Sequence, residues 1–251
     1  MAESEGRSIR WIRNQLDRFE SASRKIPPQS IVIVVDTTFW GRGYGVCVFR
    51  SPTLKRNLWW REVVIETPEI YATGLTELQA QGWIIEGAVI DGKRGVDRVF
   101  AGLPVQICQF HQMKTVTRYL TRKPQTRAGQ ELRSIALGLT KRTETEFTVQ
   151  LKSWYENWRN FLNERTPCPC CKPNRWPYTH RKLRAAHRSL LNNLPYLFTY
   201  QRYPELNIPN TTNCLDGMFS QIKNRLAVHR GLRRDRRYKL IGEILGGKEG
   251  N

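Results

Sequence analysis

Acidic residues are scarce in this chain, and long apolar runs are missing. The 251 residues include 22 Asp and Glu against 41 Lys and Arg, which gives a formal net charge of +19. An excess of this size is larger than solubility requires, so it indicates a polyanionic partner, most often nucleic acid. A membrane is the weaker interpretation, because the sequence has no apolar run of spanning length and no basic amphipathic helix with a bulky apolar face.

A secretory leader is also missing from the first residues. The N-terminus, MAESEGRSIRWIRNQLDRF, lacks the apolar core that a signal peptide requires. We therefore expect a cytoplasmic, nucleoid-associated protein whose six cysteines stay reduced. In such a chain, cysteines are core residues or metal ligands rather than a disulfide framework.

The first half of the chain has the pattern of an α/β domain. A short helix is expected over 7–26, and Pro27 and Pro28 end it. Runs of β-branched and apolar residues then predict strands at 31–35, 43–51, 58–65, 84–92 and 105–110. Helices are predicted from Thr67 to Gly82 and over 95–103. The short links between the first three strands favour an antiparallel meander.

Strand signals disappear between residues 113 and 209, where helical patterns follow one another around a Cys- and Pro-rich break. A last helix begins near residue 211 and ends at Gly231. We therefore predict an α/β fold whose mixed sheet is interrupted by an all-helical insertion. The expected segments are an N-terminal helical stub (1–29), a core (30–112), the helical insertion (113–209), and the last helix with a basic tail (210–251).

Three aspartates stand where this order of elements brings them together. Asp36 follows the first strand, Asp91 follows the fourth, and Asp216 lies in the first turn of the last helix. Three such carboxylates suit Mg²⁺ or Mn²⁺, and a pair of these ions serves phosphodiester chemistry. Each aspartate alone also has an ordinary explanation, as a turn residue or a residue favoured at a helix start. The hypothesis therefore depends on the set of three.

Four short motifs follow one another along the chain. They are Asp36-Thr37-Thr38, Asp91-Gly92, Cys108-Gln109-Phe110-His111, and a block from Thr211 to Gly217 that is followed by Lys223, Arg225, His229, Arg230 and Gly231. An all-helical segment separates the third motif from the fourth. From about residue 31 to 235, this arrangement resembles the Mutator-like transposases, which include bacterial insertion-sequence transposases.

The resemblance implies a ribonuclease H-like core with a helical insertion before the last catalytic helix. It implies that Asp36, Asp91 and Asp216 bind two Mg²⁺ or Mn²⁺ ions, with His111 close to them as a further catalytic residue. The implied activity is cleavage of a DNA strand followed by attack of the freed 3′-hydroxyl on target DNA. The implied partner is double-stranded DNA, as element ends and as target, without a membrane, and assembly as a homodimer on DNA is left open.

Two departures from the family pattern keep alternatives open. Asp216 stands where the family usually has Glu, whose side chain is one methylene longer. About thirty residues precede the first predicted strand, where these transposases usually carry a DNA-binding region, so a truncated element or a fragment is one of the alternatives. The alternatives are an inactive or domesticated derivative that only binds DNA, and a ribonuclease H-like nuclease that cuts without joining.

A second metal site is weighed in the insertion. Cys168 and Cys171 have the spacing of a zinc knuckle, and His180 and His187 follow them. A structural Zn²⁺ site is therefore set against reduced cysteines in a loop. Cys108 and His111 supply only two ligands, so we interpret them as a packed cysteine beside a hydrogen-bonded histidine.

Basic and aromatic side chains give the last predictions. The tail after the last helix is strongly basic, and phosphate contacts are favoured there over a solvated face, with a second track in the insertion. The expected DNA-contacting residues are Arg181, Arg184, Arg188, Lys223, Arg225, His229, Arg230, Arg233 and Arg234, with Arg236 and Arg237 in the same tail. Trp154 and Trp158, four residues apart, predict core packing rather than stacking on an unpaired base.

Overall fold

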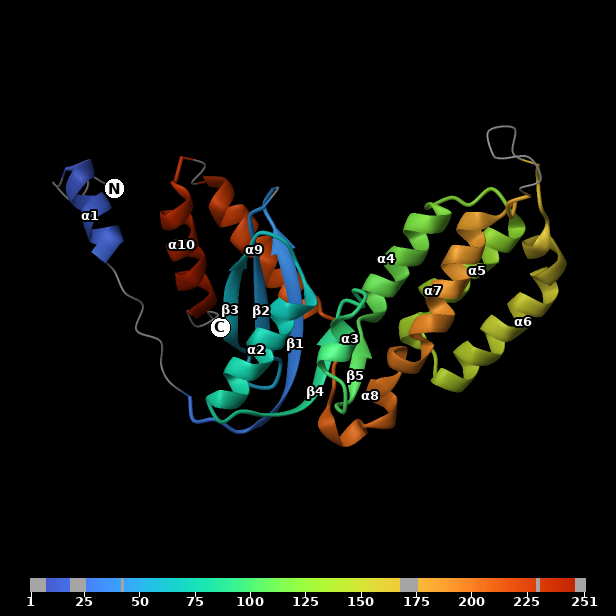
Figure 1. Ribbon diagram of the computed structural model, residues 1–251, viewed down its shortest axis with the longest axis horizontal. Helices are drawn as coiled ribbons and strands as arrows, with labels where there is room; N and C mark the ends of the chain where they lie inside the picture. Colours follow the sequence, from blue (N-terminus) through green and yellow to red (C-terminus); the bar gives the residue numbers. More distant parts are fainter. Residues whose placement is uncertain (1–7, 19–25, 42, 168–175, 229–230, 247–251) are drawn as a thin grey trace. The chain divides into compact units, whose positions relative to one another are not determined.

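A computed structural model of the protein describes residues 8–18, 26–41, 43–167, 176–228 and 231–246 (Figure 1). Five strands form one mixed sheet in the order β3-β2-β1-β4-β5. They are β1 (Ser30–Phe39), β2 (Gly45–Ser51), β3 (Arg56–Val63), β4 (Ile84–Ile90) and β5 (Val105–Ile107). Strands β2 and β3 pair antiparallel, and β4 and β5 pair parallel. The predicted α/β class and mixed sheet are confirmed.

The chain divides into two compact units, and each is described by itself. The first unit holds residues 1–31, 36–84 and 213–251, and the second holds 32–35 and 85–212. Strand β1 therefore contributes residues to both units. This division differs from the predicted segments, because β4 and β5 belong with the helices that follow them. The physical reason is a set of buried hydrogen bonds between the region of β5 and those helices.

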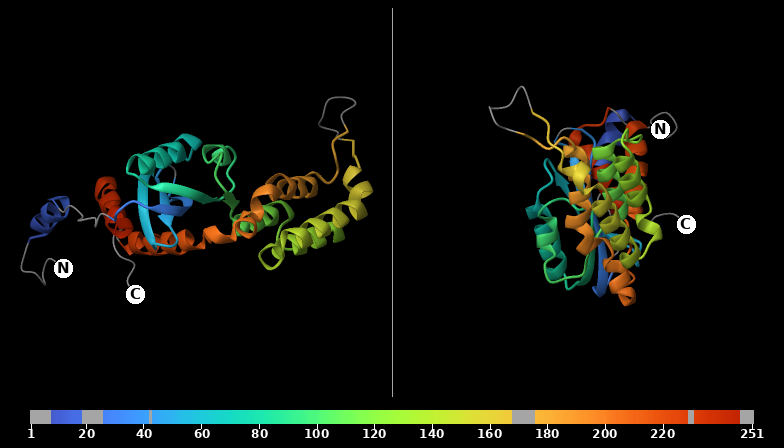
Figure 2. Two further views of the ribbon diagram at one scale, coloured as in Figure 1. Left: turned by 90° about the horizontal axis from the view of Figure 1, so that it is seen from below. Right: turned by 90° about the vertical axis from the view of Figure 1, so that its right-hand side faces the viewer.

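In the first unit, helices cover both faces of β2 and β3 (Figure 2). Helix α2 (Pro68–Ala80) covers one face, and α9 (Asn213–Val228) and α10 (Arg234–Gly246) cover the other, while α1 (Ile9–Arg18) belongs to the same unit without covering the sheet. Helix α2 approaches so closely that a Cβ at Gly74 would lie 2.7 Å from the ring of Phe49. On the other face, the Asn57 amide donates to the Leu245 carbonyl of α10 (2.8 Å).

A β-bulge allows β3 to serve both layers of this unit. Phe49 and Arg50 are consecutive in β2, but they pair with Trp59 and Asn57. Leu58 is therefore the extra residue, and the alternation of faces resets around it. Trp59 consequently packs near Gly74 of α2, while Asn57 reaches α10.

The second unit is built from two parallel strands and a group of helices. The helices are α3 (Val96–Val99), α4 (Gln109–Leu120), α5 (Arg127–Leu137), α6 (Glu144–Asn163), α7 (Arg181–Leu197) and α8 (Thr199–Arg202), with 3₁₀ turns at Leu139–Lys141 and Pro204–Leu206. Thr143 and Glu146 form a capping box that begins α6. The Thr143 hydroxyl accepts from the Glu146 N–H, and the Glu146 carboxylate accepts from the Thr143 N–H. This local pattern fixes where the longest helix starts.

Buried polar contacts tie β5 to the helices that follow it. The side-chain amides of Gln106 and Gln109 both donate to the Leu197 carbonyl (2.9 Å each), and the Thr199 hydroxyl donates to the Val105 carbonyl (2.6 Å). Each of these groups would be costly to bury without its partner. They explain why the two strands and the helical segment form one compact unit.

The two tryptophans of α6 behave as the sequence predicts. Trp154 is buried, and its Nε1 donates to the Ala128 carbonyl of α5 (3.0 Å). Trp158 is half-buried, and its Nε1 donates to Glu131 of α5 (2.7 Å). Both side chains therefore hold α6 against α5, and the packing prediction is confirmed.

Several predicted boundaries were wrong. Strand β1 continues to Phe39, so Asp36 lies inside the strand rather than at its end. Strand β5 ends at Ile107, because Cys108 takes the N-cap position of α4 and the rest of the Cys-Gln-Phe-His motif is helical. The residues predicted as a basic tail include a 13-residue helix, α10, whose Ile241 and Leu245 are buried.

The remaining differences are smaller. The first helix is described over Ile9–Arg18, and residues 19–25 of its predicted span lie outside the described residues. Between 113 and 209, the described residues form helices, turns and one isolated bridge between Arg165 and Tyr178. Within the parts of the chain that the structure covers, no helix has the length and apolar character needed to cross a membrane.

Candidate metal centre

Two of the predicted carboxylates belong to the first unit. Asp36 lies in β1 with only 6% of its surface exposed, and its Oδ1 accepts a hydrogen bond from the Thr37 N–H (2.8 Å). Asp216 lies in the first turn of α9. Its Oδ2 is shielded from solvent and has no hydrogen-bond partner among the described residues. A shielded carboxylate oxygen without a donor is costly, and a bound cation would remove that cost.

His111 lies in the first turn of α4, in the second unit, and Thr212 holds one of its ring nitrogens. The Thr212 hydroxyl is 3.3 Å from His111 Nδ1 and 3.4 Å from the sulfur of Cys108. A hydroxyl has one proton to give. When that proton goes to the Cys108 sulfur, the hydroxyl accepts from Nδ1–H, and Nε2 keeps the lone pair that a metal ligand needs.

Cys108 completes this buried contact set. Its sulfur also accepts from the Thr212 backbone N–H (3.3 Å), and the residue is fully buried. Burial raises the pKa of the Cys108 thiol, but hydrogen bonds with His111 and Thr212 outweigh burial and hold the pKa below its ordinary value. The C-x-x-H motif therefore acts as a packed cysteine beside an oriented histidine. The role of Thr212 was not predicted, although the residue lies in the Thr211 to Gly217 block, because no local pattern marks a contact 101 residues away.

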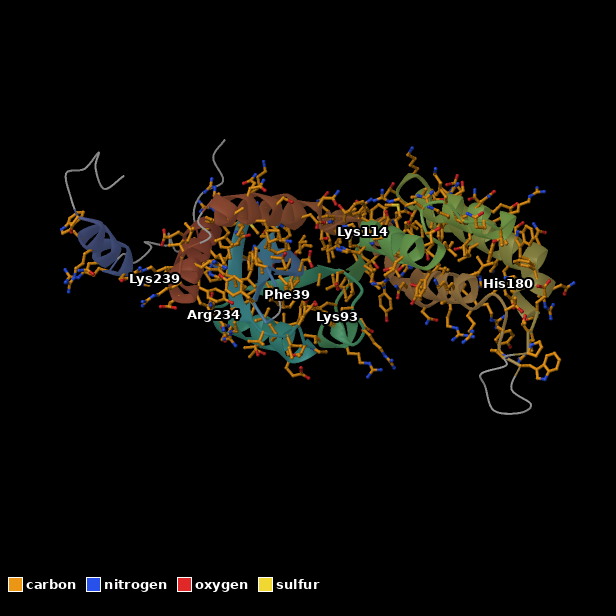
Figure 3. The ribbon with its side chains drawn as sticks, turned by 90° about the horizontal axis from the view of Figure 1, so that it is seen from above. Phe39, Lys93, Lys114, His180, Arg234 and Lys239 are labelled. Atoms are coloured by element: carbon orange, nitrogen blue, oxygen red, sulfur yellow. The ribbon has the colours of Figure 1, made fainter. Side chains whose placement is uncertain are left out.

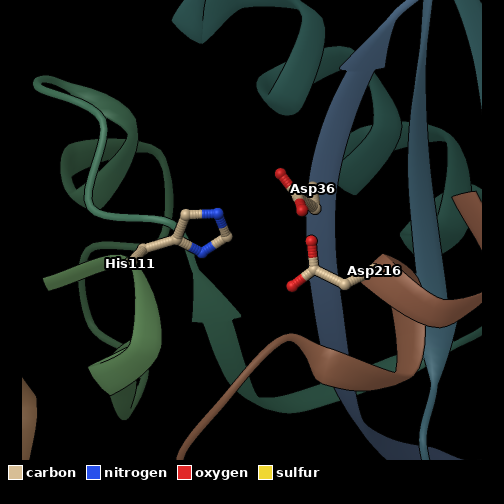
Figure 4. Close-up of side chains that lie close together, drawn as sticks. All are labelled: Asp36, His111 and Asp216. Carbon is tan, nitrogen blue, oxygen red and sulfur yellow. The ribbon is translucent and has the colours of Figure 1, made fainter. Parts of the chain in front are cut away.

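Asp36, His111 and Asp216 form a group that could hold a metal ion. One ligand atom from each lies within 4.8 Å of the other two (Figure 4). Carboxylate oxygens favour Mg²⁺ and Mn²⁺, and an imidazole nitrogen extends the range of suitable ions to Zn²⁺. With the shielded Oδ2 of Asp216, this donor set fits a divalent cation.

Asp91 is not a member of this group of three. It directly follows β4, and its Oδ1 accepts from the Lys93 N–H (2.8 Å), next to Gly92 with φ +84°. This is the turn geometry that gives Asp91 its ordinary explanation. Its role as a ligand for a second ion stays a prediction.

The residues weighed for zinc are divided between described and undescribed parts of the chain. Cys168 and Cys171 lie outside the described residues. His180 bonds to Glu164 (2.9 Å) and stacks on Phe161. His187 is buried and stacks on Tyr155, and desolvation, followed by the charge of Arg184, lowers its pKa to about 4. Both rings have packing roles, and the zinc site stays a prediction.

The residues predicted to contact DNA fall into three sets. Arg184 donates to the Leu162 carbonyl (2.9 Å), and Arg234 pairs with Glu62 (2.5 Å), so these two arginines already hold other elements. His229 and Arg230 lie outside the described residues. The exposed set is Arg181, Arg188, Lys223, Arg225 and Arg233. DNA binding by any of them stays a prediction.

Comparisons with known proteins give no further guide to this centre. No protein-family model, curated protein or solved structure matches the chain. The interpretation of the centre therefore depends on its own residues, and on the motifs that the sequence carries.

Proposed function

We propose that this protein is a transposase of the Mutator-like, bacterial insertion-sequence type, which cleaves DNA and joins the freed 3′-hydroxyl to a target. The observation that carries the proposal is the grouping of Asp36, Asp216 and His111 within 4.8 Å. Three further features support it: the motif order along the sequence, the formal net charge of +19, and a mixed sheet compatible with a ribonuclease H-like core.

Each residue of the centre has a distinct part in this chemistry. A bound divalent cation would supply Lewis-acid activation of the attacking oxygen and neutralise charge on the phosphate. Asp36 would bind the cation from strand β1, and Asp216 would bind it from the first turn of α9. His111, fixed through Nδ1 by Thr212, would offer Nε2 as a third ligand or as a proton acceptor. Asp91 would serve the second ion.

The Asp at position 216 is compatible with an active copy. Its carboxylate reaches the group although the side chain is one methylene shorter than the Glu usual in the resembling family. A ribonuclease H-like nuclease that hydrolyses DNA without joining is the second candidate, because the same group of metal ligands could activate water alone. Catalysis in either case requires metal, which separates both from a derivative that only binds DNA.

Metal binding by the whole chain is the first test. Titration with Mn²⁺, followed by calorimetry or by the electron paramagnetic resonance of free Mn²⁺, should show binding that weakens at least about tenfold in Asp36→Asn and Asp216→Asn. Asp235→Asn, which removes an exposed aspartate in the first turn of α10, is the matched control. Equal affinity in all four proteins would overturn the metal centre, and parallel titrations with Mg²⁺ and Zn²⁺ would rank the ions.

Strand cleavage and joining are the second test. The protein is incubated with Mn²⁺ and duplexes that end in the candidate element's terminal repeats, beside Asp91→Asn and Asp216→Asn. Nicking and joining that disappear in both variants support the transposase. Nicking without joining of a pre-cut end supports the nuclease, and DNA binding without chemistry in any protein supports the derivative that only binds.

A further inference from the structure

Three exposed cations follow one another along α4 and the turn after it, in the second unit. Lys114, Arg118 and Arg122 are four residues apart, and all three are exposed. Lys114 and Arg118 lie on α4, about 6 Å apart along the helix axis, and Arg122 lies two residues past the end of α4. We call this set the α4 cationic face, and Figure 3 labels Lys114 within it.

An open apolar cavity borders the α4 cationic face. It measures about 500 Å³, and its apolar walls come from Phe110, Met113 and Leu137. Phe110 is 38% exposed and Leu137 is 43% exposed, which is unusual for large apolar side chains in a charged surface. The Lys114 amine lies 4.3 Å from the centre of the Phe110 ring, so cation and ring share one surface.

The cavity has cationic walls but no acidic ones. Its lining includes all three cations of the face and neither Asp nor Glu. Within the described residues, none of the three cations forms an ion pair. A solvated helix face usually mixes both signs of charge, whereas an unbalanced cationic row beside exposed apolar groups indicates an anionic partner with apolar parts.

We infer that the α4 cationic face binds single-stranded DNA. Backbone phosphates would lie on Lys114, Arg118 and Arg122, and an unpaired base would pack against Phe110 in the apolar cavity. The phosphates of duplex DNA could also bind the cations, but its paired bases could not enter the cavity. The exposed ring of Phe110 therefore favours a single strand. The choice of DNA as the polyanion rests on the proposed function, since strand cleavage and transfer leave unpaired ends.

Binding is tested with a fluorescently labelled thymidine oligonucleotide, by anisotropy, with EDTA present to remove divalent ions. The combined variant K114Q/R118Q/R122Q should bind more weakly, and the slope of log affinity against log salt concentration should fall by about 2. Phe110→Ala should lose about tenfold in affinity without a change in that slope.

A matched control removes the same charge elsewhere in the same unit. K141Q/R159Q/K182Q changes three exposed cations that line no part of the cavity, and the slope should change by less than about 1. Equal losses in the control and in the α4 variant would overturn the inference, because net charge alone would then explain binding. An unchanged affinity of Phe110→Ala, or an α4 effect confined to duplex DNA or to anionic phospholipid vesicles, would also overturn it.

The experiment separates this inference from the proposed catalysis. Asp36→Asn and Asp216→Asn should keep oligonucleotide binding in EDTA, and K114Q/R118Q/R122Q should keep Mn²⁺ affinity. Loss of metal-dependent nicking with intact oligonucleotide binding would defeat only the proposed function. Intact nicking with an α4 variant that binds normally would defeat only the inference.

Discussion

Helices α4 and α10 are both rich in cations, but the structure treats their cations differently. In α10, Arg234 pairs with Glu62 of β3 and Arg236 pairs with Asp17 of α1. On α4, Lys114 and Arg118 have no such partner within the described residues, and neither does Arg122 just past the end of the helix. The comparison shows that the number of cations on a helix does not reveal how many can meet a ligand. That depends on which carboxylates the fold brings to each one.

The two helices also differ in what their cations stabilise. The hydrogen bond from Arg234 to Glu62 raises the pKa of Arg234, and the one from Arg236 lowers the pKa of Asp17, so each pair is stabilised in its charged form. Together with the buried side chains of α10, these pairs attach the helix to the first unit. The α4 cationic face has nothing comparable to hold, which leaves it available to a partner.

The largest predicted effect is the loss of stability when a buried side chain of α10 is shortened. Ile241 is 1% exposed, so Ile241→Ala should lower the free energy of unfolding by about 2–5 kcal/mol, through lost burial and the cavity left behind. Chemical denaturation of the whole protein measures it, with Lys239→Ala on the exposed side of the same helix as the control. If both variants were as stable as the parent, α10 would be a solvated tail and the comparison would fail.

A smaller effect is expected when His187 of the second unit takes up a proton beside Arg184. The pKa of His187 is lowered to about 4, so the folded protein resists protonation while the unfolded chain binds a proton near its ordinary pKa of 6.5. Stability is therefore complete above about pH 6.5 and falls as the pH drops toward 4, by about 2 kcal/mol after allowance for solvent screening.

Denaturation midpoints between pH 7 and pH 4.5 measure this dependence. His187→Phe keeps a ring to stack on Tyr155 but cannot take a proton, so its stability should vary less over the same range. Identical pH profiles for the two proteins would show that His187 is not the responsible group.

The ion pairs of Arg234 and Arg236 in α10 should contribute a little to the free energy of unfolding. R234Q/R236Q should lower the denaturation midpoint slightly, because exposed ion pairs are weak, and high salt should shrink the difference. The parent protein in the same salt series is the reference. A difference that grows with salt would mean that the two arginines act through something other than charge.

The α4 cations should contribute least of all. K114Q/R118Q/R122Q should leave the free energy of unfolding within about 0.5 kcal/mol of the parent, because the three side chains are exposed and hold no other element. The same denaturation series measures it. A clear loss of stability would mean that these cations also serve the fold, and the contrast between the two helices would disappear.

Much of the secondary structure followed from local sequence patterns. The β-branched run that forms β1, Pro68 at the start of α2 and the positive φ of Gly82 at its end were all predictable, because each depends on neighbouring residues. Helix α10 was missed, since its many arginines obscured the helical spacing of Ile241 and Leu245. The end of β5 was misplaced because Cys108 and Gln109 suit a strand as well as a helix start.

The candidate centre shows a similar division. The sequence singled out Asp36 and Asp216 by their places beside a strand and at a helix start, and the family resemblance added His111. It ranked Asp91 with the two acids and gave no sign of the contact that Thr212 makes. Local chemistry alone therefore determined the order of elements and the carboxylate ligands. Only the tertiary structure decided which acids share a site, which hydroxyl orients His111 and which cations stay unpaired. These depend on packing between residues far apart in the chain, which no short stretch of sequence contains.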